Sequence, residues 1–446
     1  MRAGPSQEEI RRQNLGALLR YVHIHGATSR AELTTSLGLN RSTIGALTAE
    51  LAAAGLVSER APRETGRAGR PSLVVRPESG RVFAYAYSIE ADRLRAARIG
   101  LGGVVLDRRQ AERPPGLLAV ETLPLLAGFV KEMHQAVPEG SVYVGSGVAV
   151  CGRLRRPDGT GQPGPEAAVR PAPDTGVRPG PEAAVRPAPD TGVRPGPEAA
   201  VRPGPDTGVR LGPDGAAEVG GDELDGPLAE ALGELLPQER PVLVSNAADV
   251  SAVAEHARGA ARGYDDVIYL HRDVGIEAGI IVGGRRLTGQ GGYAGEVGHM
   301  VVQPGGRPCG CGSYGCWETE IGEYAMLRAA GRGEAASREA ALRLVDAASR
   351  GDAAAQAAIR QVGDWLGFGV ANLVNIFNPG VVIFGGTLRD VYLAAAARVR
   401  SRLNSLALAT PREQVRLRTP QLGEDAALVG AAELAFEHLL AAPLEM

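Results

Sequence analysis

Residues 295–299 read Gly-Glu-Val-Gly-His, and residues 309–318 read Cys-Gly-Cys-Gly-Ser-Tyr-Gly-Cys-Trp-Glu. Three of the chain's four cysteines stand within eight positions here, too close together for a disulfide framework and better placed to share a metal ion. Three thiolates and one imidazole favour zinc and leave no open position for a catalytic water, so we expect a structural site. The alternative is a group of free cysteines near an unrelated histidine. The candidate ligands are His299, Cys309, Cys311 and Cys316.

Strand-like and helix-like segments alternate on both sides of this stretch. Apolar runs bounded by glycine-rich turns predict strands, and a helix is expected around residues 116–136. Alternating β and α elements indicate an α/β fold in which helices cover a mixed sheet. Because the pattern occurs twice, we expect a two-lobed body with a cleft between the lobes. The expected strands are Val82–Ile89, Leu94–Ile99, Val104–Asp107, Val142–Val150, Val242–Ser245, Val267–Leu270, Gly279–Val282 and Val381–Phe384.

The N-terminal residues form a separate pattern that is rich in helix signals. Ser29 and Glu32 predict a capping box at the start of a short helix, which Gly38 ends, and Asn40 then caps the next helix. Two short helices joined by a glycine-containing turn form a helix-turn-helix, whose second helix suits a DNA major groove. In that helix Ile44, Leu47 and Leu51 face inward, and the outward side chains are Arg41, Ser42, Thr43, Gly45 and Ala46.

A glycine- and arginine-rich segment at residues 63–71 precedes a further strand-like run. Two strands around such a tip make a wing, whose arginines can enter a minor groove or clamp phosphates. The charge agrees, because residues 1–80 hold 11 arginines and 7 glutamates in a chain with 48 basic and 51 acidic residues. We expect a double-stranded DNA operator as partner; the alternatives are a winged helix for protein contacts or a merely solvated basic loop. The expected DNA contacts are Arg41, Ser42, Thr43, Ala46, Arg67 and Arg70.

Residues 164–211 are three near-identical 16-residue copies of a proline-rich sequence. Each copy has no aromatic residue and a proline every few positions, so it cannot bury enough apolar surface to offset its ordering entropy. We expect a disordered loop, partly in polyproline II conformation, that is simply tolerated. A proline-rich arm that binds a partner is the alternative.

Length and composition limit the number of domains and the classes of protein to be considered. A chain of 446 residues that is 44% hydrophobic can bury a sizeable core, and two or three domains are expected. No apolar run reaches the roughly 18 residues needed to span a bilayer, and the first residues are polar and charged rather than a signal peptide. We therefore expect no membrane partner and a cytoplasmic location.

The glycine-flanked Glu-Val-Gly-His stretch, the Cys-Gly-Cys-Gly run and the winged helix with Gly69-Arg70-Pro71-Ser72 resemble the repressor branch of the ROK family, which comprises repressors and sugar kinases. The resemblance implies an N-terminal winged helix-turn-helix followed by a two-lobed actin-like, hexokinase-type domain. It also implies a structural zinc ion, a sugar site at the cleft, and homodimers or homotetramers. The expected divisions are residues 8–80 for the DNA-binding domain, 81–161 for the first lobe, 162–215 for the repeat insertion and 216–446 for the remainder.

The same resemblance implies a set of sugar-binding residues. Carboxylates and an amide that converge on a pocket can bind vicinal hydroxyls, and a zinc-bound imidazole can offer its other ring nitrogen to a ligand. Each carboxylate also has a plainer interpretation, since Glu296 could cap a helix and Glu318 could lie on a solvated face. The residues at the matching positions are Asn246, Glu296, His299 and Glu318.

The chain departs from the kinases of that family at three places. Ala247 stands where the resemblance implies the catalytic aspartate, and a methyl group cannot accept a proton from a sugar hydroxyl. Asp249 lies about half a helical turn further on and is expected to point elsewhere. The two phosphate loops correspond to residues 88–93 and 273–277, where carboxylates replace glycines and oppose ATP. We therefore expect no kinase activity.

The sequence thus predicts a DNA-binding transcriptional regulator, a repressor and not an enzyme, with a kinase-dead sensor domain for a sugar or sugar phosphate. Two alternatives stay open. One is a sugar kinase that carries a fused DNA-binding domain, and the other is a body that serves only as a constitutive dimerisation platform. Cys151, in place of a proline that the resemblance implies, and the nearby insertion leave the effector open.

Overall fold

The computed structural model describes residues 6–61, 72–113, 119–151, 230, 232–234, 240–273, 275–333 and 337–445. The predicted wing-tip contacts Arg67 and Arg70 and the repeat at 164–211 lie outside the described residues. In these ranges, every helix is too short or too polar to cross a membrane.

The N-terminal unit is a winged helix-turn-helix. Three helices pack against a three-stranded antiparallel sheet of order β1-β3-β2. The elements are α1 (Gln7–His25), β1 (Thr28–Ser29), α2 (Arg30–Leu37), α3 (Arg41–Ala53), β2 (Val57–Arg60) and β3 (Val74–Pro77).

The predicted helix signals lie where the helices begin and end. Ser29 accepts a hydrogen bond from the N–H of Glu32 (3.1 Å) at the start of α2, but among the described residues the return bond from the Ser29 N–H to the Glu32 side chain is absent, so only half of the predicted capping box forms. Gly38 ends that helix in the left-handed conformation (φ 65°), which glycine adopts at little cost. Asn40 accepts from the N–H of Thr43 (2.8 Å) and starts α3. Local chemistry alone therefore fixes the turn between the two helices.

Two five-stranded sheets follow, and they share one strand order. In each sheet three antiparallel strands form a meander and two further strands add in parallel, giving β6-β5-β4-β7-β8 and β11-β10-β9-β12-β13. This duplicated arrangement confirms the predicted two-lobed α/β fold. The first sheet has β4 (Val82–Ile89), β5 (Arg93–Gly100), β6 (Val104–Glu112), β7 (Val142–Val150) and β8 (Val242–Asn246). The second has β9 (Val267–Arg272), β10 (Ile276–Val282), β11 (Arg285–Arg286), β12 (Val381–Phe384) and β13 (Arg416–Arg418).

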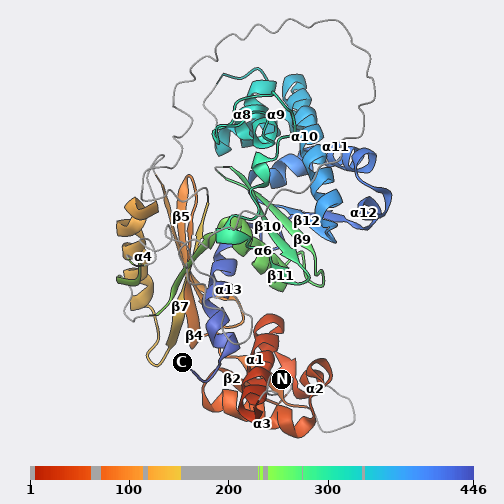
Figure 1. Ribbon diagram of the computed structural model, residues 1–446. Helices are drawn as coiled ribbons and strands as arrows, with labels where there is room; N and C mark the ends of the chain where they lie inside the picture. Colours follow the sequence, from red (N-terminus) through yellow and green to blue (C-terminus); the bar gives the residue numbers. More distant parts are fainter. Residues whose placement is uncertain are drawn as a thin grey trace, which may run out of the picture. The chain divides into compact units, whose positions relative to one another are not determined.

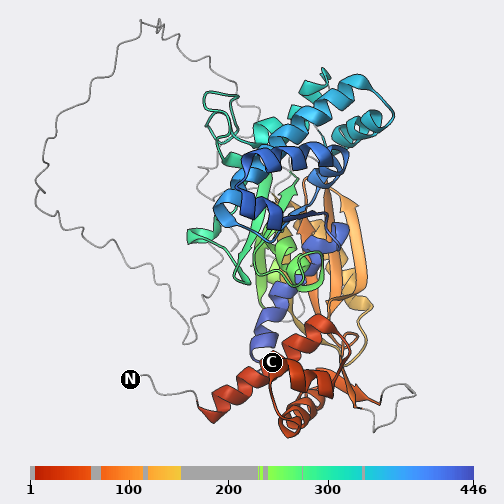
Figure 2. The same cartoon turned by 90° about the vertical axis from the view of Figure 1, so that its right-hand side faces the viewer.

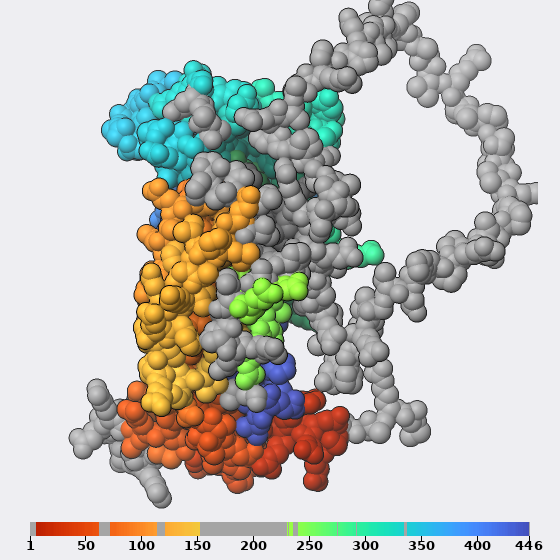
Figure 3. All heavy atoms as spheres, turned by 90° about the vertical axis from the view of Figure 1, so that its left-hand side faces the viewer, coloured from red at the N-terminus to blue at the C-terminus, as the bar shows by residue number. Residues whose placement is uncertain are grey.

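Helices cover the outer faces of both sheets. Leu126, Val130 and Met133 of α4 (Leu123–Gln135) pack on the first sheet, on the side seen in Figure 3. The helix predicted around 116–136 therefore begins later, where Pro124 stands in its first turn and suits a helix start. On the second sheet, α10 (Ala353–Phe377) and α11 (Thr387–Leu406) lie side by side (Figure 2).

The remaining short elements surround the second sheet and its connections. The α-helices are α7 (Glu318–Ile321), α8 (Glu323–Ala329), α9 (Arg338–Ser349) and α12 (Ala409–Gln414), and the 3-10 turns are η1 (Ala119–Thr122), η2 (Gln290–Gly292), η3 (Val297–His299) and η4 (Gly423–Asp425).

Two central helices, α6 (Ala247–Arg258) and α13 (Ala426–Ala441), lie between the sheets (Figure 1). Helix α13 packs on β4 and β7, α6 packs on β9 and β10, and the two helices pack on each other. A glycine stands at each of these three interfaces, where an added Cβ would overlap a backbone carbonyl of the neighbour. The three contacts are Gly147 of β7 with Ala431, Gly430 of α13 with Val250, and Gly279 of β10 with Ala248.

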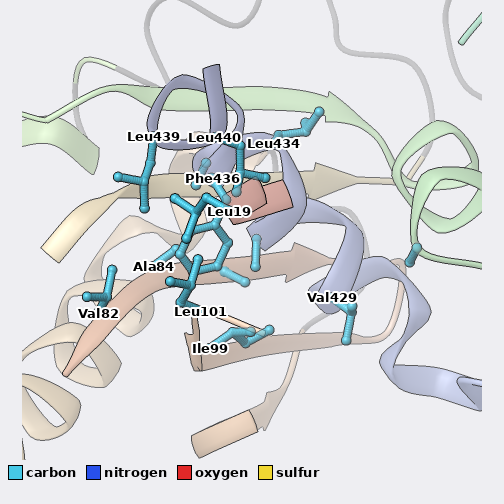
Figure 4. Packing of buried hydrophobic residues seen from close by; sticks show 14 of the residues in the cluster. Leu19, Val82, Ala84, Ile99, Leu101, Val429, Leu434, Phe436, Leu439 and Leu440 are labelled. Carbon is cyan, nitrogen blue, oxygen red and sulfur yellow. The ribbon is translucent and has the colours of Figure 1, made fainter. Parts of the chain in front are cut away.

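Helix α1 of the winged helix packs against the C-terminal ends of α6 and α13. Leu19 of α1 packs among Leu101, Phe436 and Leu440 (Figure 4). An added Cβ on Gly16 of α1 would come within 2.6 Å of the Leu440 carbonyl oxygen, so the backbones of α1 and α13 are also close.

A buried polar cluster lies at the same junction. The Nδ1 of His23 accepts from the N–H of Gly102 (2.9 Å), and its Nε2 lies 2.9 Å from Oε2 of Glu433 and 2.5 Å from Nη2 of Arg258. Arg258, the last residue of α6, donates to Glu433 (2.6 Å) and to the carbonyls of His23 and Gly102 (2.8 and 3.0 Å). Burial alone would raise the pKa of Glu433, but His23 and Arg258 outweigh it and lower the pKa to about 2. This carboxylate is therefore charged and fully paired.

The close α6–α13 contact predicts the effect of a single methyl group. Gly430→Ala should destabilise the protein by about 3 kcal/mol, because the new Cβ overlaps the Val250 carbonyl oxygen and forces the helices apart. Gly128→Ala is the control, since Gly128 lies in α4 with nothing within 4 Å of an added Cβ, and it should stabilise by about 0.5–1 kcal/mol. Urea denaturation measures both. Equal free energies for the two variants would contradict the packing described here.

Candidate functional site

The outer surface of α3 is the candidate nucleic-acid interface. Arg41, Ser42 and Ala46 are exposed and Thr43 is partly exposed, as predicted. The inward side chains Ile44, Leu47 and Leu51 are buried, so the helix cannot turn this surface away from solvent. Arg41 forms no ion pair within the described residues, and its guanidinium is available for a phosphate or a base edge.

The four predicted metal ligands are brought together. Their ligand atoms all lie within 4.8 Å of one another. The Cys311 and Cys316 sulfurs are 3.6 Å apart, and the Cys309 sulfur is 3.6 Å from Nδ1 of His299. A tetrahedral ion with metal–sulfur bonds of about 2.3 Å would separate its sulfurs by about 3.8 Å. The spacing therefore suits a shared metal ion, and at 3.6 Å the Cys311 and Cys316 sulfurs are not joined in a disulfide.

The backbone around the cysteines is built for a tight loop. Val301 pairs with Cys316, and Pro308 pairs with Tyr314, which closes the segment into a small hairpin. Gly315 has φ 74° and lies against the Gln303 carbonyl, where no Cβ fits. The loop is anchored by Trp317, which is fully buried and donates its Nε1–H to the Trp365 carbonyl (2.8 Å). The ligand geometry is thus tied to helix α10.

Two predicted sugar-binding carboxylates flank His299 on opposite sides. Oε1 of Glu318 lies 3.6 Å from Nδ1 of His299 and 2.9 Å from the Cys309 sulfur. Oε2 of Glu296 lies 3.7 Å from Nε2. The imidazole therefore faces the cysteines with one nitrogen and Glu296 with the other, which suits a metal-bound histidine that also contacts a ligand.

Asn246 joins this group through Glu277, a residue for which the sequence predicts no role other than opposing ATP. Oδ1 of Asn246 accepts from the N–H of Ala248 (2.7 Å) and caps α6. Its side chain also hydrogen-bonds to Glu277 of β10, which is 8% exposed. Burial, with a further contribution from Glu296, raises the pKa of Glu277 to about 7. The available sequence signal was an acidic residue at position 277, where the resemblance implies a glycine.

Asp249 is a second buried carboxyl at the start of α6. It is 6% exposed, and its Oδ1 has no hydrogen-bond partner within the described residues. Burial raises its pKa to about 7, and Arg286 opposes the shift. Ala247 beside it is fully buried, so a methyl group fills the position that the resemblance gives to a catalytic base.

The turns β4–β5 and β9–β10 occupy equivalent places in the two sheets. Glu90 of the first turn is buried and accepts from Arg95 (2.7 Å) and Arg93 (2.9 Å). Burial alone would raise its pKa, but the two arginines hold the pKa below its ordinary value. Asp273 of the second turn accepts from the N–H of Ala91 (2.7 Å), so a carboxylate of one lobe takes a backbone donor of the other.

Comparison with known proteins gives one consistent family. Residues 222–438 match the ROK family. The chain is 30% identical over 200 residues to the xylose repressor of Bacillus spizizenii, covering 45% of this chain and 52% of the repressor, about half of that relative's length. It is 35% identical over 214 residues to the glucokinase of Streptomyces coelicolor, covering 44% of this chain and 68% of the glucokinase.

A solved structure extends the likeness to the whole fold. The crystal structure of a ROK family transcriptional regulator, a homolog of the E. coli MLC protein, superposes with a TM-score of 0.67 at 21% identity and covers 98% of both chains. At that identity the likeness concerns the fold, including the N-terminal winged helix.

The buried acid beside Asn246 predicts a pH dependence. The pKa of Glu277 is raised in the folded state from 4.5 to about 7, so its favourable contribution is complete below pH 4.5 and is lost as the pH rises through 7. Glu277→Gln has no ionisable group at this position and therefore removes this loss. The free energy of unfolding of the variant minus that of wild type should be roughly 2–3 kcal/mol larger at pH 8 than at pH 4.

Urea denaturation at several pH values measures this difference, with Glu339→Gln as control because Glu339 is 83% exposed on α9. A constant difference between wild type and Glu277→Gln across this pH range would contradict the raised pKa.

Proposed function

The chain belongs to the ROK family, and on that premise we propose that it is a DNA-binding transcriptional repressor whose sugar-kinase-like body binds a ligand without transferring phosphate. The observation that carries the proposal is a winged helix-turn-helix with an exposed recognition surface on α3, joined in one chain to a two-lobed body. Similarity to a xylose repressor supports the same assignment.

We assign residues 8–80 to DNA binding, 81–161 and 216–446 to the two lobes, and 162–215 to an insertion. Arg41, Ser42, Thr43 and Ala46 would enter the major groove, and the wing arginines Arg67 and Arg70 would contact the backbone or minor groove. A homodimer or homotetramer would present two such helices to two half-sites one helical turn apart.

The central helices provide a physical route between ligand and DNA. Helix α6 begins at Asn246, in the proposed ligand site, and ends about 18 Å away at Arg258, which holds α1. Helix α13 follows η4 at the cleft and packs on α1 at its other end. A ligand that moves the lobes would therefore move α1 and change the spacing of paired winged helices, which weakens operator binding.

Asn246, Glu296, His299 and Glu318 are the proposed ligand contacts, with Glu277 as an addition from the geometry. Two carboxylates around one imidazole and a capping amide present acceptors and a donor for vicinal hydroxyls. A sugar or sugar phosphate is the proposed effector class. The buried Asp249 and Glu277 add two carboxyl groups beside these contacts, more than hydroxyl recognition alone requires.

We assign zinc to His299, Cys309, Cys311 and Cys316. Three thiolates and one imidazole at these separations form a closed tetrahedral set, which favours a structural role. The bound ion would stabilise the loop at residues 303–316 and fix the ring of His299, while Glu296 orients the ring from its other nitrogen. Glu318, whose Oε1 lies 3.6 Å from the histidine Nδ1, would be held beside the ion.

The absence of phosphoryl transfer is part of the proposal. Ala247 supplies no base, and Glu90 and Asp273 place carboxylates in both turns where a nucleotide's phosphates would need backbone donors and cations. The alternative function is a sugar kinase with a fused DNA-binding domain, which similarity to a glucokinase keeps in view.

The zinc assignment predicts one ion per chain in the purified protein. Cys311→Ser should lose the ion and lower the unfolding temperature by roughly 5–10 °C, because the loop loses its cross-link. Cys151→Ser is the control, since Cys151 is buried away from the four ligands and should keep the metal. Elemental analysis and thermal unfolding provide the measurements. Equal metal content in the two variants would show that the cluster is not the site.

The DNA-binding assignment predicts that the full-length protein selects a defined site from genomic fragments. Arg41→Ala should weaken binding to that site roughly 10- to 100-fold, because a base or phosphate contact is lost. Lys131→Ala removes an exposed charge on α4 and should leave the affinity unchanged. Fluorescence anisotropy at fixed salt measures both.

A coupled kinase assay on common hexoses with Mg-ATP separates this function from its alternative. No turnover is expected with wild type. Formation of any sugar phosphate by the pure wild-type protein would establish the kinase instead.

A further inference from the structure

An arginine that is not among the predicted DNA contacts lies at the edge of the α3 surface. Arg30 is the first residue of α2, and its side chain reaches the wing strand β2. There its Nε and Nη2 each donate to one oxygen of Glu59 (both 2.5 Å). The Arg30 side chain is 31% exposed, so the ion pair is partly hydrated and stabilises the fold little. A role in stability alone is therefore a weak explanation for this pair.

The two hydrogen bonds to Glu59 use one edge of the Arg30 guanidinium and leave another edge open. A guanidinium has five N–H donors in one plane. Glu59 takes the Nε–H and one N–H of Nη2, and Nη1 forms no hydrogen bond within the part of the chain that the structure describes. Three donors therefore remain on the edge formed by Nη1 and Nη2, an arrangement that suits bidentate binding of a phosphate.

Gly45 of α3 allows this open edge to lie at the recognition surface. A Cβ added to Gly45 would lie 3.5 Å from Nη1 of Arg30, so a longer side chain would take the place of the guanidinium. Gly45 stands four residues after Arg41, and residues at that spacing are neighbours on one side of a helix. The Arg30 guanidinium thus lies against α3 about one helical turn beyond Arg41, beside the surface proposed to enter the major groove.

The backbone at Arg30 is attached to the start of the second wing strand. The N–H of Arg30 donates to the Leu73 carbonyl (2.9 Å), and the N–H of Ala31 donates to Oγ of Ser72 (3.2 Å). Together with the ion pair to Glu59, these bonds hold Arg30 at both its backbone and its side chain. Less side-chain freedom is then lost when the guanidinium binds a ligand.

We propose that Arg30 binds a phosphate of the DNA backbone between α3 and the wing, and that Glu59 is a positioning residue that fixes the Arg30 guanidinium. The inference rests on the proposed function and adds a contact to it. In helix-turn-helix units the first helix of the motif crosses the DNA backbone, and Arg30 begins that helix. A phosphate contact reads no bases, but it fixes the register of α3 in the groove.

Fluorescence anisotropy with the full-length protein and its selected operator, at several salt concentrations, tests the contact. Arg30→Ala should weaken binding roughly tenfold and lower the slope of log affinity against log salt by about 1, because one phosphate is no longer neutralised. A random duplex should lose affinity by the same factor. Arg30→Lys should keep the salt slope, because the charge remains. Arg350→Ala, at an exposed arginine of α9 paired with Asp346, should change neither quantity.

The sign of the effect of Glu59→Ala tests the positioning role. Removal of a negative charge beside DNA would by charge alone tighten binding. Loss of the fixed guanidinium should instead weaken binding roughly threefold or more, because the Arg30 side chain must then be ordered on binding. In the Arg30→Ala background the same substitution should tighten binding, since only the effect of charge is left.

Tightening by Glu59→Ala in the wild-type background would overturn the positioning role, and so would equal weakening in both backgrounds, which indicates damage to the wing. An unchanged affinity and salt slope for Arg30→Ala, in a protein that binds its operator, would overturn this inference alone. A wild-type protein that selects no DNA would overturn the proposed function as well.

Discussion

The contact between α6 and α13 is the constraint on which the rest of the structure depends. The two helices lie between the sheets, and each of the three interfaces in this layer has a glycine where the neighbouring backbone leaves no room for a methyl group. Backbones in such contact cannot slide or tilt separately without opening a void, since protein interiors are close-packed. The two helices must therefore move together, so a displacement at the cleft end of the pair also displaces the end that contacts α1.

Because α6 and α13 move together, the groups at the two ends of this helix pair are physically connected. At one end Asn246 caps α6 and Glu424 precedes α13, both at the cleft side of the layer. At the other end Arg258 and Glu433 enclose His23 of the winged helix in a buried, fully paired cluster. Breaking one member of such a cluster leaves a buried charge unpaired, which is costly. The junction therefore favours one position of α1 for each arrangement of the two helices.

Much of the fold follows from local signals. The bounds of β4, β7 and β12 agree with prediction because these strands are continuous apolar runs between turns, and α3 begins at Asn40 because its cap is a local hydrogen bond. The grouping of His299 with the cysteines followed from ligand type and spacing. Glu277 was not predicted as a site residue, since the groups around it, Asn246 and Glu296, come from segments distant in sequence. The glycines between helices and sheets had no local signature that distinguishes them from turn glycines.

The acidic residues in the two hairpin turns have a common physical interpretation. In each turn a carboxylate is satisfied by donors of the protein itself, Glu90 by Arg93 and Arg95 and Asp273 by the Ala91 N–H. Because Asp273 and Ala91 belong to different lobes, their hydrogen bond joins the two sheets at the cleft. The two turns, which resemble the phosphate loops of the kinases, here contact each other through this hydrogen bond. The carboxylate of Asp273 thus does more than repel phosphate, because its hydrogen bond with the Ala91 N–H connects the β9–β10 turn to the β4–β5 turn.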